Sequence, residues 1–439
     1  MKVLVTGATG FIGRHVAARL IAAGHEVLIG ARDGRRAGRV FPDQRFIACD
    51  FTRDLSSAAW SPRLEGVEAL INCVGVLQPR RRATMEAVHL TATAALFDAC
   101  LAAGVRRVIQ VSALGVDTGI DLHYATSKLA ADTYLQGLDL DWTILRPSLV
   151  YTPAGSYGGT SLLRAQAVLP FFVPLPGRGD QLFQPVFMDD LTEAIRRLLE
   201  DGKAIGEIVP VTGPEPLAVR DILFGLRRWL GLGRAWALPI PMPFMRLLAR
   251  LGDLLGAGPL TTTSLGMIEQ GNAAPPDPFT RATGIVPRPF DRVLAQHPAQ
   301  VQDRWHARLY FLRPVLQTVL GLFWIVSASV MLFGQGVFIA RELSGSDPAA
   351  PGAAFDPWQV VFGLALLSGL LLLLRWKVRL VLVLQAWALA IVLLWWAASL
   401  LGVMAVVGWQ LVWPNLMLFL GFALIFLATL AAWALGDDT

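Results

Sequence analysis

The first half of the chain alternates short apolar runs with longer runs in which apolar residues recur at helical spacing. The apolar runs predict strands at residues 2–6, 26–31, 45–48, 69–73, 107–111 and 142–145. Helix-like runs, such as residues 84–103, lie between them. Strands that alternate with helices in this way predict an α/β fold with a doubly wound parallel sheet. Ligands of such a sheet bind at the carboxyl ends of its strands.

The last third of the chain follows another pattern. Four runs contain no Asp, Glu, Lys, Arg or His: residues 314–340, 358–374, 380–401 and 411–435. A helix needs about 20 apolar residues to cross a bilayer. Buried core helices are the alternative, but they would need polar outer faces, and these runs are apolar all round. We therefore predict an all-α transmembrane domain of four helices.

The cations that flank these runs predict their orientation. They precede the first run or lie between the second and third: Arg304, Arg308, Arg313, Arg375, Lys377 and Arg379. The loop at residues 341–356 carries one Arg and three acids. The positive-inside rule then places both termini in the cytoplasm. We expect a multi-pass protein of a bacterial inner membrane, and no signal peptide, because the chain begins with a strand.

Composition agrees with lipid contact in part of the chain. Of its 439 residues, 54% are hydrophobic and 16% charged, against about 25% charged in soluble domains. The net charge of +5 is not gathered into a basic stripe with aromatic residues, so no nucleic-acid partner is expected. The three cysteines lie far apart, which indicates a reducing compartment, buried thiols and no disulfide, zinc or other metal site.

A glycine-rich turn follows the first predicted strand. Gly7, Gly10 and Gly13 open a helix-like run that continues to residue 23. Gly7 permits the tight turn, Gly10 lets the backbone approach a pyrophosphate, and Gly13 allows close packing of the helix. The spacing is GxxGxxG, not the usual GxGxxG, but its place between a strand and a helix predicts a dinucleotide site in a Rossmann-type domain.

Two further positions bear on the choice of dinucleotide. Arg32 ends the second strand, with Arg35 and Arg36 nearby, and a guanidinium suits a ribose 2′-phosphate. We therefore prefer NADP to NAD, although Asp33 lies beside it and a solvated loop arginine is the alternative. Asp50, after the third strand, binds the adenine amino group or caps a turn.

A candidate catalytic group follows the fifth strand. Ser112 lies twelve residues before Tyr124, and Lys128 follows four residues later. At that spacing Tyr124 and Lys128 share one helix face, so the ammonium is expected to lower the phenol pKa. Tyr124 would protonate a carbonyl oxygen as hydride arrives, Ser112 would donate a hydrogen bond to it, and Lys128 would also hold the nicotinamide ribose. An ordinary surface Tyr/Lys pair is the alternative.

Together these motifs resemble the short-chain dehydrogenase/reductase superfamily over about the first 300 residues. The resemblance rests on residues 7–13, 72–75, 111–113, 124–128 and 145–147. Residues 111–115 and 183–187, with Asp189 and Asp190, resemble the atypical branch typified by the nucleotide-binding accessory subunit of respiratory complex I. Residues 260–261, 284–285 and the Asn272 region are similar to the C-terminal subdomain of that branch. The four apolar runs look more loosely like the DoxX-like membrane family.

The resemblance implies a set of cofactor-binding residues: Gly7, Thr9, Gly10, Phe11, Ile12, Gly13, Arg32, Asp50, Cys73, Val74, Gly75, Lys128 and Pro147. His89 departs from the pattern, since related enzymes often have an Asn there that helps bind a proton-relay water. His89 is either part of an altered relay or a packed helix residue. Many relatives in the atypical branch have lost the Tyr/Lys pair, which this chain keeps. Asp189 and Asp190 fit an N-cap before residues 191–199.

The predicted organisation is residues 1–150 as an NAD(P)-binding domain and 151–300 as the rest of the sheet with a small substrate subdomain. A linker at 301–313 and the membrane domain at 314–435 follow. Within the subdomain, residues 242–256 predict an amphipathic helix that lies on lipid or packs in the core.

Three functions remain open. The first is an NADP-dependent oxidoreductase that acts on a small-molecule or lipid-like carbonyl substrate. The second is a non-catalytic NAD(P)H-binding subunit or sensor of a membrane-protein complex. The third is an epimerase or dehydratase that retains its cofactor.

Overall fold

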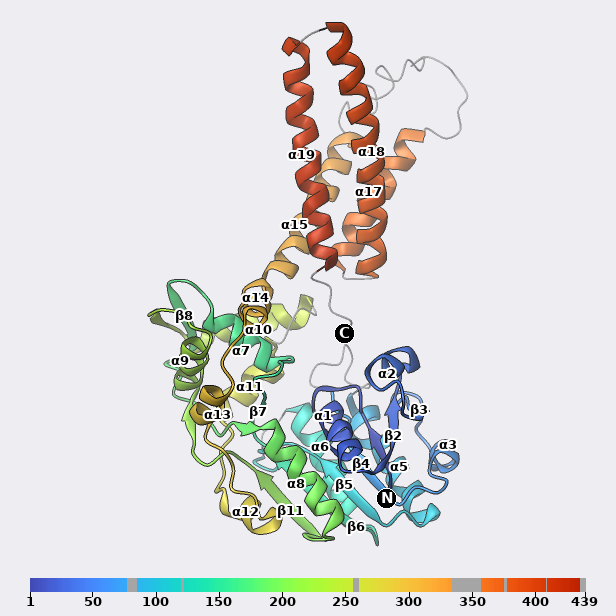
Figure 1. Cartoon of the computed structure of the whole chain (residues 1–439), viewed down its shortest axis with the longest axis vertical. Helices are drawn as coiled ribbons and strands as arrows, with labels where there is room; N and C mark the ends of the chain where they lie inside the picture. The colour runs from blue at the N-terminus through green and yellow to red at the C-terminus, as the bar shows by residue number, and fades with distance from the viewer. Residues whose placement is uncertain are drawn as a thin grey trace. The chain divides into compact units, whose positions relative to one another are not determined.

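The computed structural model describes residues 1–76, 85–119, 122–255, 260–333, 357–374, 377–407 and 409–434. The chain forms two compact units, Met1–Ala307 and Arg308–Thr439 (Figure 1). Their boundary falls inside the segment predicted as a linker, whose first part is helix α14 (Val301–Leu309).

Unit 1 is built on a seven-stranded sheet with the order β11-β6-β5-β4-β1-β2-β3. All neighbouring strands are parallel. The strands are β1 (Lys2–Thr6), β2 (Glu26–Ala31), β3 (Phe46–Ala48), β4 (Ala69–Asn72), β5 (Arg107–Val111), β6 (Asp141–Pro147) and β11 (Glu207–Val211). The predicted parallel α/β sheet is thus confirmed, and the ends of the six predicted strands differ by at most two residues. The seventh strand, β11, had no individual prediction and lies in the segment expected to hold the rest of the sheet. The strand order reverses between β1 and β4, where doubly wound sheets bind their ligands.

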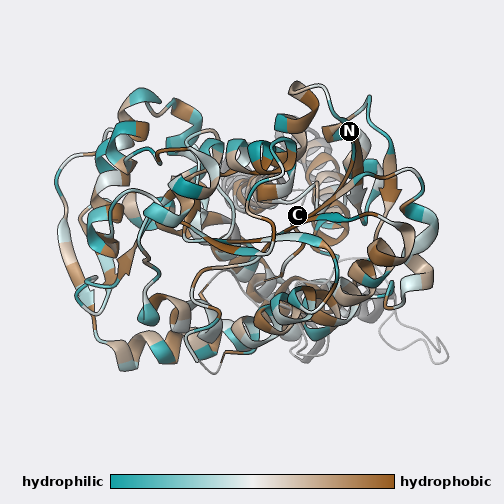
Figure 2. Ribbon diagram, turned by 90° about the horizontal axis from the view of Figure 1, so that it is seen from below, coloured by the Kyte–Doolittle hydropathy of each residue, from teal (hydrophilic) through white to brown (hydrophobic). Residues whose placement is uncertain are grey.

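Helices cover both faces of this sheet. They are α1 (Phe11–Ala22), α2 (Gly34–Val40), α3 (Ser57–Trp60), α5 (Ala92–Ala103), α6 (His123–Gln136) and α8 (Met188–Glu200), with a 3-10 turn η1 (Ser61–Arg63) and a π-helical turn η2 (Ala87–Thr91). The helix predicted at residues 84–103 therefore begins with a π-helical turn before α5, and residue 84 lies outside the described residues. Figure 2 shows mostly hydrophobic strands running between helices that carry residues of both kinds.

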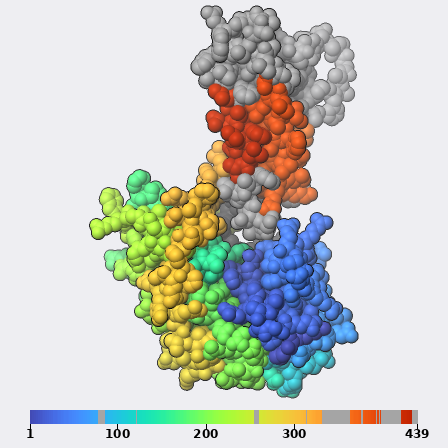
Figure 3. Space-filling view, viewed as in Figure 1, coloured from blue at the N-terminus to red at the C-terminus, as the bar shows by residue number. Residues whose placement is uncertain are grey.

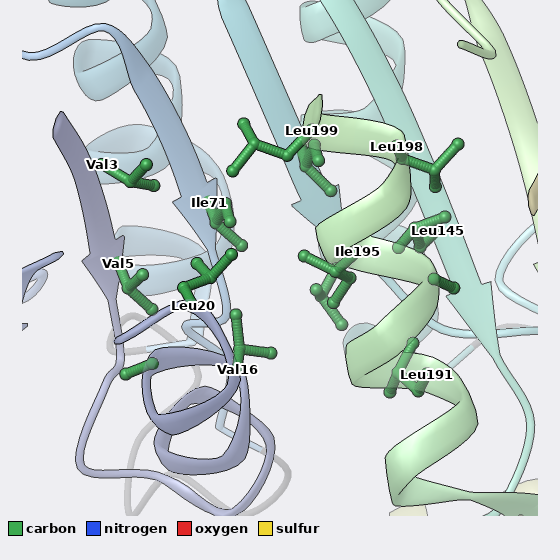
Figure 4. Close-up of a cluster of buried hydrophobic side chains, with 14 of the residues drawn as sticks. Val3, Val5, Val16, Leu20, Ile71, Leu145, Leu191, Ile195, Leu198 and Leu199 are labelled. Atoms are coloured by element: carbon green, nitrogen blue, oxygen red, sulfur yellow. The ribbon is translucent and has the colours of Figure 1, made fainter. Parts of the chain in front are cut away.

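Alternate strand residues enter two separate cores. Val3 and Val5 of β1 pack with one side of α1 and α8, as Figure 4 shows for Val16, Leu20 and Ile195. Leu4, between them, packs on the opposite face with α3 and α5. Because side chains alternate along a strand and both faces are covered, the strands are apolar throughout. This explains why continuous apolar runs identified them.

The rest of unit 1 consists of helices and three two-stranded sheets, β7–β10, β9–β12 and β8–β13. The strands are β7 (Val150–Tyr151), β8 (Phe172–Pro176), β9 (Leu182–Phe183), β10 (Val186–Phe187), β12 (Leu217–Ala218) and β13 (Trp236–Ile240). The helices are α7 (Gly159–Ala167), α9 (Val219–Trp229), α10 (Met242–Leu255), α11 (Thr262–Gln270), α12 (Asp277–Thr283) and α13 (Phe290–Gln296). The predicted amphipathic helix at 242–256 is α10, and residue 256 lies outside the described residues.

The N-cap prediction for Asp189 and Asp190 is wrong. Helix α8 begins at Met188, with Phe187 as its N-cap residue and no side-chain cap hydrogen bond. Asp190 instead accepts hydrogen bonds from the backbone N–H (2.9 Å) and Nε (2.7 Å) of Arg288. This contact spans about a hundred positions of sequence, so local spacing could not reveal it.

Unit 2 contains a helix at each predicted apolar run: α15 (Leu312–Phe333), α17 (Pro357–Leu373), α18 (Val378–Val407) and α19 (Trp409–Ala434). Among the residues that the structure describes, one helical stretch, Val301–Val330, is long and apolar enough to cross a membrane, judged by length and composition. Since core helices of soluble proteins pass the same test, the four-span membrane domain stays a prediction. The loop at 341–356, Arg375 and position 408 lie outside the described residues.

Two glycines let α15 and α17 approach closely. A Cβ on Gly369 would lie 2.7 Å from the Gly321 carbonyl oxygen, and one on Gly321 would lie 3.2 Å from the Gly369 oxygen. Small residues at such a crossing allow backbone contact. Gln385 of α18 also donates a hydrogen bond to Ser368 of α17, 3.0 Å away, as expected for a glutamine between helices.

We expect Gly369→Ala to destabilise unit 2 by about 1–3 kcal/mol, because the methyl group overpacks the helix crossing. The measurement is thermal unfolding of the full-length protein in detergent, followed by helical circular dichroism. Gly421→Ala in α19 is the control, since a Cβ there meets nothing within 4 Å. Equal melting temperatures for the two variants would contradict the close approach of α15 and α17.

Candidate functional site

The glycine turn after β1 is shaped by close backbone contacts. Gly7 has a φ of +69°, and a Cβ on it would lie 3.0 Å from the Cys73 carbonyl. The Gly10 N–H donates to the Gly7 carbonyl (2.8 Å), and Gly10 is the N-cap residue of α1. A Cβ on Gly13 would lie 2.2 Å from the Gly7 oxygen. Each glycine therefore has a steric reason, and the turn brings α1 tightly against the β1–β4 crevice.

This turn fits the phosphates of a dinucleotide. Phe11, Ile12 and Gly13 form the first turn of α1, where backbone N–H groups have no acceptor within the helix. The positive end of the helix dipole adds to their attraction for an anion. Thr9 precedes them, and its carbonyl accepts a hydrogen bond from Arg14 (3.3 Å). The absence of side chains at Gly7 and Gly10 leaves room for an approaching pyrophosphate.

A buried amide ladder, which the sequence reasoning missed, fixes the neighbouring loop. Thr6 Oγ1 donates to Asn72 Oδ1 (2.6 Å), and Asn72 Nδ2 donates to Gln110 Oε1 (2.8 Å). The Val74 N–H donates to the same Asn72 oxygen (3.2 Å). The ladder ties β1, β4 and β5 together and sets the path of residues 73–75, which are predicted to contact the cofactor. The sequence contained a signal for this ladder, because a polar residue lies at or next to the end of each of these three apolar runs.

The residues predicted to select the cofactor lie at the same edge of the sheet. Arg32 is exposed and makes no ion pair with any residue that the structure describes. Asp33, which had counted against NADP, caps α2 by accepting hydrogen bonds from the N–H groups of Arg35 (2.9 Å) and Arg36 (3.3 Å). Its carboxylate is therefore occupied by the helix.

Asp50 caps a turn, as one of its two predicted roles requires. It accepts hydrogen bonds from the backbone N–H (3.0 Å) and Oγ1 (2.7 Å) of Thr52. Burial alone would raise the pKa of Asp50, but these bonds and the charges of Arg32 and Arg53 outweigh it, so the pKa is lowered. Contact with adenine stays a prediction.

The structure places the half-buried Tyr124 and the buried Lys128 in one cluster. Both lie in the first two turns of α6, and Lys128 Nζ donates to the Val111 carbonyl (3.2 Å), next to Ser112. A Cβ on Gly75 would lie 3.4 Å from Lys128 Nζ. Pro147 ends the adjacent strand β6, and its carbonyl accepts from the Leu114 N–H (3.0 Å). The predicted residues therefore meet at the carboxyl edge of the sheet.

Asp132 joins this cluster, and the sequence analysis did not identify it. It is fully buried on α6, and its Oδ2 accepts from Ser112 Oγ (2.8 Å) and Arg146 Nε (3.1 Å). Its Oδ1 has no hydrogen-bond partner among the described residues. Burial raises the pKa of Asp132, although hydrogen bonds and the charges of Lys128 and Arg146 oppose it. The sequence contained a signal for Asp132, because residues 124, 128 and 132 are spaced four apart and so share one helix face.

The predicted lowering of the Tyr124 pKa is wrong. Burial of the phenol raises its pKa, and the negative charge of Asp132 raises it further. Burial also lowers the pKa of Lys128, while Asp132 acts in the opposite direction. Removal from water disfavours every charged form, so the packing around the pair outweighs the effect expected from their spacing. Tyr124 is held as a neutral phenol, which is the form that donates a proton.

His89 is a packed residue of the π-helical turn. Its Nε2 accepts from the Val76 N–H (2.9 Å), so the ring proton lies on Nδ1, which donates to Ser127 Oγ (2.9 Å). Burial, with the nearby charges of Lys128 and His123, lowers its pKa to about 3. Its ring meets the Tyr124 ring edge to face, with centroids 5.5 Å apart. Because both nitrogens are bonded within the protein, His89 positions Tyr124 and cannot bind a relay water.

The class of this site agrees with comparisons to known proteins. A family model described as NAD(P)H-binding matches residues 7–164. Unit 1 therefore contains an NAD(P)-binding Rossmann domain, and the chain is similar to a complex I subunit and to an epimerase family protein.

Three known proteins are similar to this chain. The chain is 26% identical over 314 residues, 67% of its length and 79% of the relative, to NADH dehydrogenase [ubiquinone] 1 alpha subcomplex subunit 9, mitochondrial, of Mus musculus. It is 31% identical over 174 residues, 38% of its length and 53% of the relative, to ceramide reductase of Caulobacter vibrioides. UDP-glucose 4-epimerase of Thermus thermophilus, solved in complex with NAD, matches with a TM-score of 0.53 and 21% identity over 70% of this chain and 99% of that one. The last likeness concerns the fold alone.

We expect Gly13→Ala to weaken NADPH binding by at least about tenfold, since the methyl group would displace Gly7 or α1 and disturb the anion site. Fluorescence titration of the full-length protein with NADPH measures it. Gly233→Ala is the control, because a Cβ there meets nothing within 4 Å. Unchanged affinity in a folded Gly13→Ala protein would show that the cofactor does not use this turn.

Proposed function

We propose that this protein is a membrane-anchored, NADP-dependent oxidoreductase of the short-chain dehydrogenase/reductase type that reduces a carbonyl group of an amphiphilic substrate. The observation that carries the proposal is the cluster of Ser112, Tyr124 and Lys128 at the carboxyl edge of the sheet, in which Ser112 and Lys128 are buried and Tyr124 is a neutral phenol. A chain that only binds its cofactor has no need of such a proton donor.

The residues around the glycine turn suit NADPH. The N–H groups of Phe11, Ile12 and Gly13 would hold the pyrophosphate, and Lys128 would hold the nicotinamide ribose. Arg32 is free for a 2′-phosphate because Asp33 is bound to the N–H groups of α2. The remaining predicted contacts would come from Gly7, Thr9, Gly10, Asp50, Cys73, Val74, Gly75 and Pro147.

The chemistry of the cluster is proton donation to a carbonyl oxygen. NADPH, when bound, supplies the hydride that reduces the carbonyl carbon. Tyr124 donates its phenolic proton to the oxygen, and the ammonium of Lys128 offsets the charge that then develops on the phenol. Ser112 is free to donate to the same oxygen only when its hydrogen leaves Asp132. A substrate oxygen would compete for this hydrogen with the Asp132 carboxylate, which also pairs with Arg146 (3.1 Å).

The anchor is the second part of the proposal. We place the four helices of unit 2 across a bacterial inner membrane, with unit 1 and the C-terminus in the cytoplasm. Their apolar composition and the cations beside the predicted spans support this orientation. The DoxX-like resemblance supports it in pattern only. A substrate with a lipid-like part is the expected consequence, and the ceramide reductase among the relatives acts on such a molecule by its name.

A second function has its own support. The relative from complex I covers 67% of this chain, which favours an NAD(P)H-binding subunit or sensor within a membrane-protein complex.

A third function is an epimerase or dehydratase, which would use the same residues as the reductase. The likeness to UDP-glucose 4-epimerase supports it only through the shared fold. The cluster distinguishes the catalysts from the non-catalytic subunit, because only a catalyst depends on the Tyr124 hydroxyl.

We expect Tyr124→Phe to reduce NADPH oxidation by the full-length protein with lipid extract by at least about 100-fold, because the proton donor is lost. NADPH affinity should stay unchanged. Tyr134→Phe is the matched control, since Tyr134 lies on the same helix but donates to Asp98 on the surface. Unchanged turnover in the Tyr124→Phe variant would contradict the mechanism. A stable partner in pull-downs from detergent, together with no turnover by the unsubstituted protein, would favour the subunit.

The raised pKa of Tyr124 predicts a pH dependence. Its pKa lies above the ordinary value of about 10, so the proton-donating form persists up to that pH. We expect the reductive kcat/KM to be flat between about pH 7 and 10, and the reverse oxidation, which needs the phenolate, to rise over the same range. Steady-state assays in both directions measure this. A reductive rate that falls with an apparent pKa near 7 would contradict the buried neutral phenol.

A further inference from the structure

The ribbon formed by β8 and β13 has one buried and one open apolar face. Val173 and Leu175 of β8 are buried in the core of unit 1. In the paired register Trp236 lies opposite Phe172, and these two side chains, with Leu238 two residues along β13, are 83%, 41% and 43% exposed. Phe171, just before β8, is 76% exposed. The ribbon therefore presents aromatic side chains to the solvent on the face away from the core.

Helix α10 continues this open apolar surface. It starts two residues after β13 ends, and Phe244, Leu247 and Leu251 are each about half exposed, at 51%, 51% and 45%. Their spacing places them on one side of the helix. Met245 and Ala249 are buried in a cluster with Leu265 of α11. The core-packing role predicted for this helix therefore accounts for one side only.

Helix α14 adds a third exposed apolar pair. Val301 and Trp305, one turn apart, are 50% and 63% exposed, while Ala307 is buried. Figure 1 places β8, α10 and α14 at the same end of unit 1 and α12 at the other end. Figure 3 shows the green and yellow-green segments near β8 and β13 projecting from the surface. We call these residues the apolar rim: Phe171, Phe172, Trp236, Leu238, Phe244, Leu247, Leu251, Val301 and Trp305.

Unpaired arginines accompany the rim. Arg234 precedes Trp236 by two residues and Arg250 lies on α10. Both are exposed, and neither forms an ion pair within the described part of the chain. Arg246 pairs with Glu269 instead (3.0 Å). Exposed Trp, Phe and Leu beside free arginines match the chemistry of an anionic lipid surface, where rings enter the interface and guanidinium groups meet phosphates.

We infer that the apolar rim inserts into the headgroup layer of an anionic bilayer. Three observations favour lipid over a protein partner. The aromatic side chains lie on segments that project, so they can enter a deformable layer. The free charges of the rim are cationic. The apolar helix α15 begins seven positions after Trp305, so a bilayer that holds α15 lies within reach of the rim. The inference rests on the proposed membrane anchor and does not depend on catalysis. It deepens the proposed function, because a rim in the headgroup layer would let a lipid-like substrate pass from the leaflet to unit 1.

The test places a fluorescent label on the rim of the full-length protein in nanodiscs. Leu247→Cys carries a nitrobenzoxadiazole label, and Val286→Cys, 76% exposed and three positions after α12, is the matched control. Burial raises the pKa of the native thiols Cys49, Cys73 and Cys100 to about 12, so they react slowly. The unsubstituted protein measures their background labelling.

We expect nitroxide-bearing lipids to quench the label at position 247 at least about threefold more than the label at 286. Quenching should increase when phosphatidylglycerol replaces phosphatidylcholine and decrease with added salt. Equal quenching at both positions would overturn the inference. A blue-shifted but unquenched label at 247 would also overturn it, because a protein would then cover the rim. Failure of the protein to enter nanodiscs would remove the anchor and this inference together, whereas incorporation without quenching would remove this inference alone.

Discussion

The close contact between Gly13 and the Gly7 carbonyl is the constraint on which the site depends. A Cβ at Gly13 would come within 2.2 Å of that oxygen, so only glycine lets α1 approach the β1–β4 crevice. Parallel pairing places the ends of β1, β4, β5 and β6 at one edge. The first turn of α1 therefore lies at the edge that also carries Ser112, Tyr124 and Lys128, so the residues predicted to bind the cofactor and those predicted to be catalytic share one crevice.

Burial, more than the Tyr/Lys spacing, sets the protonation of that cluster. Asp132 is fully buried beside Ser112 and raises the pKa of Tyr124, whereas an ammonium one helical turn away would lower it in water. The neutral phenol suits a reductase, since reduction consumes a proton and oxidation would need a base. His89 adds rigidity, because its two nitrogens link the loop after β4 to α6.

The two units are stabilised by different kinds of packing contact. In unit 1 the sheet is covered on both faces, and nine of the exposed apolar side chains lie on or beside β8, β13, α10 and α14. In unit 2 the apolar helices meet through glycines and through a hydrogen bond from Gln385, which are devices suited to helices without polar faces. A membrane would explain both features, since it would solvate unit 2 and receive the rim.

Local pattern in the sequence determined six of the seven strands of the sheet, the glycine turn and the shared helix face of Tyr124 and Lys128. These follow from periodicity and from the steric demands of single residues, which act over a few positions. Tertiary structure decided the partner of Ser112, the Thr6–Asn72–Gln110 ladder and the pairing of Asp190 with Arg288. It also decided the direction of the Tyr124 pKa shift. Such features join residues distant in sequence, and burial, which sets their charge, exists only in the folded chain.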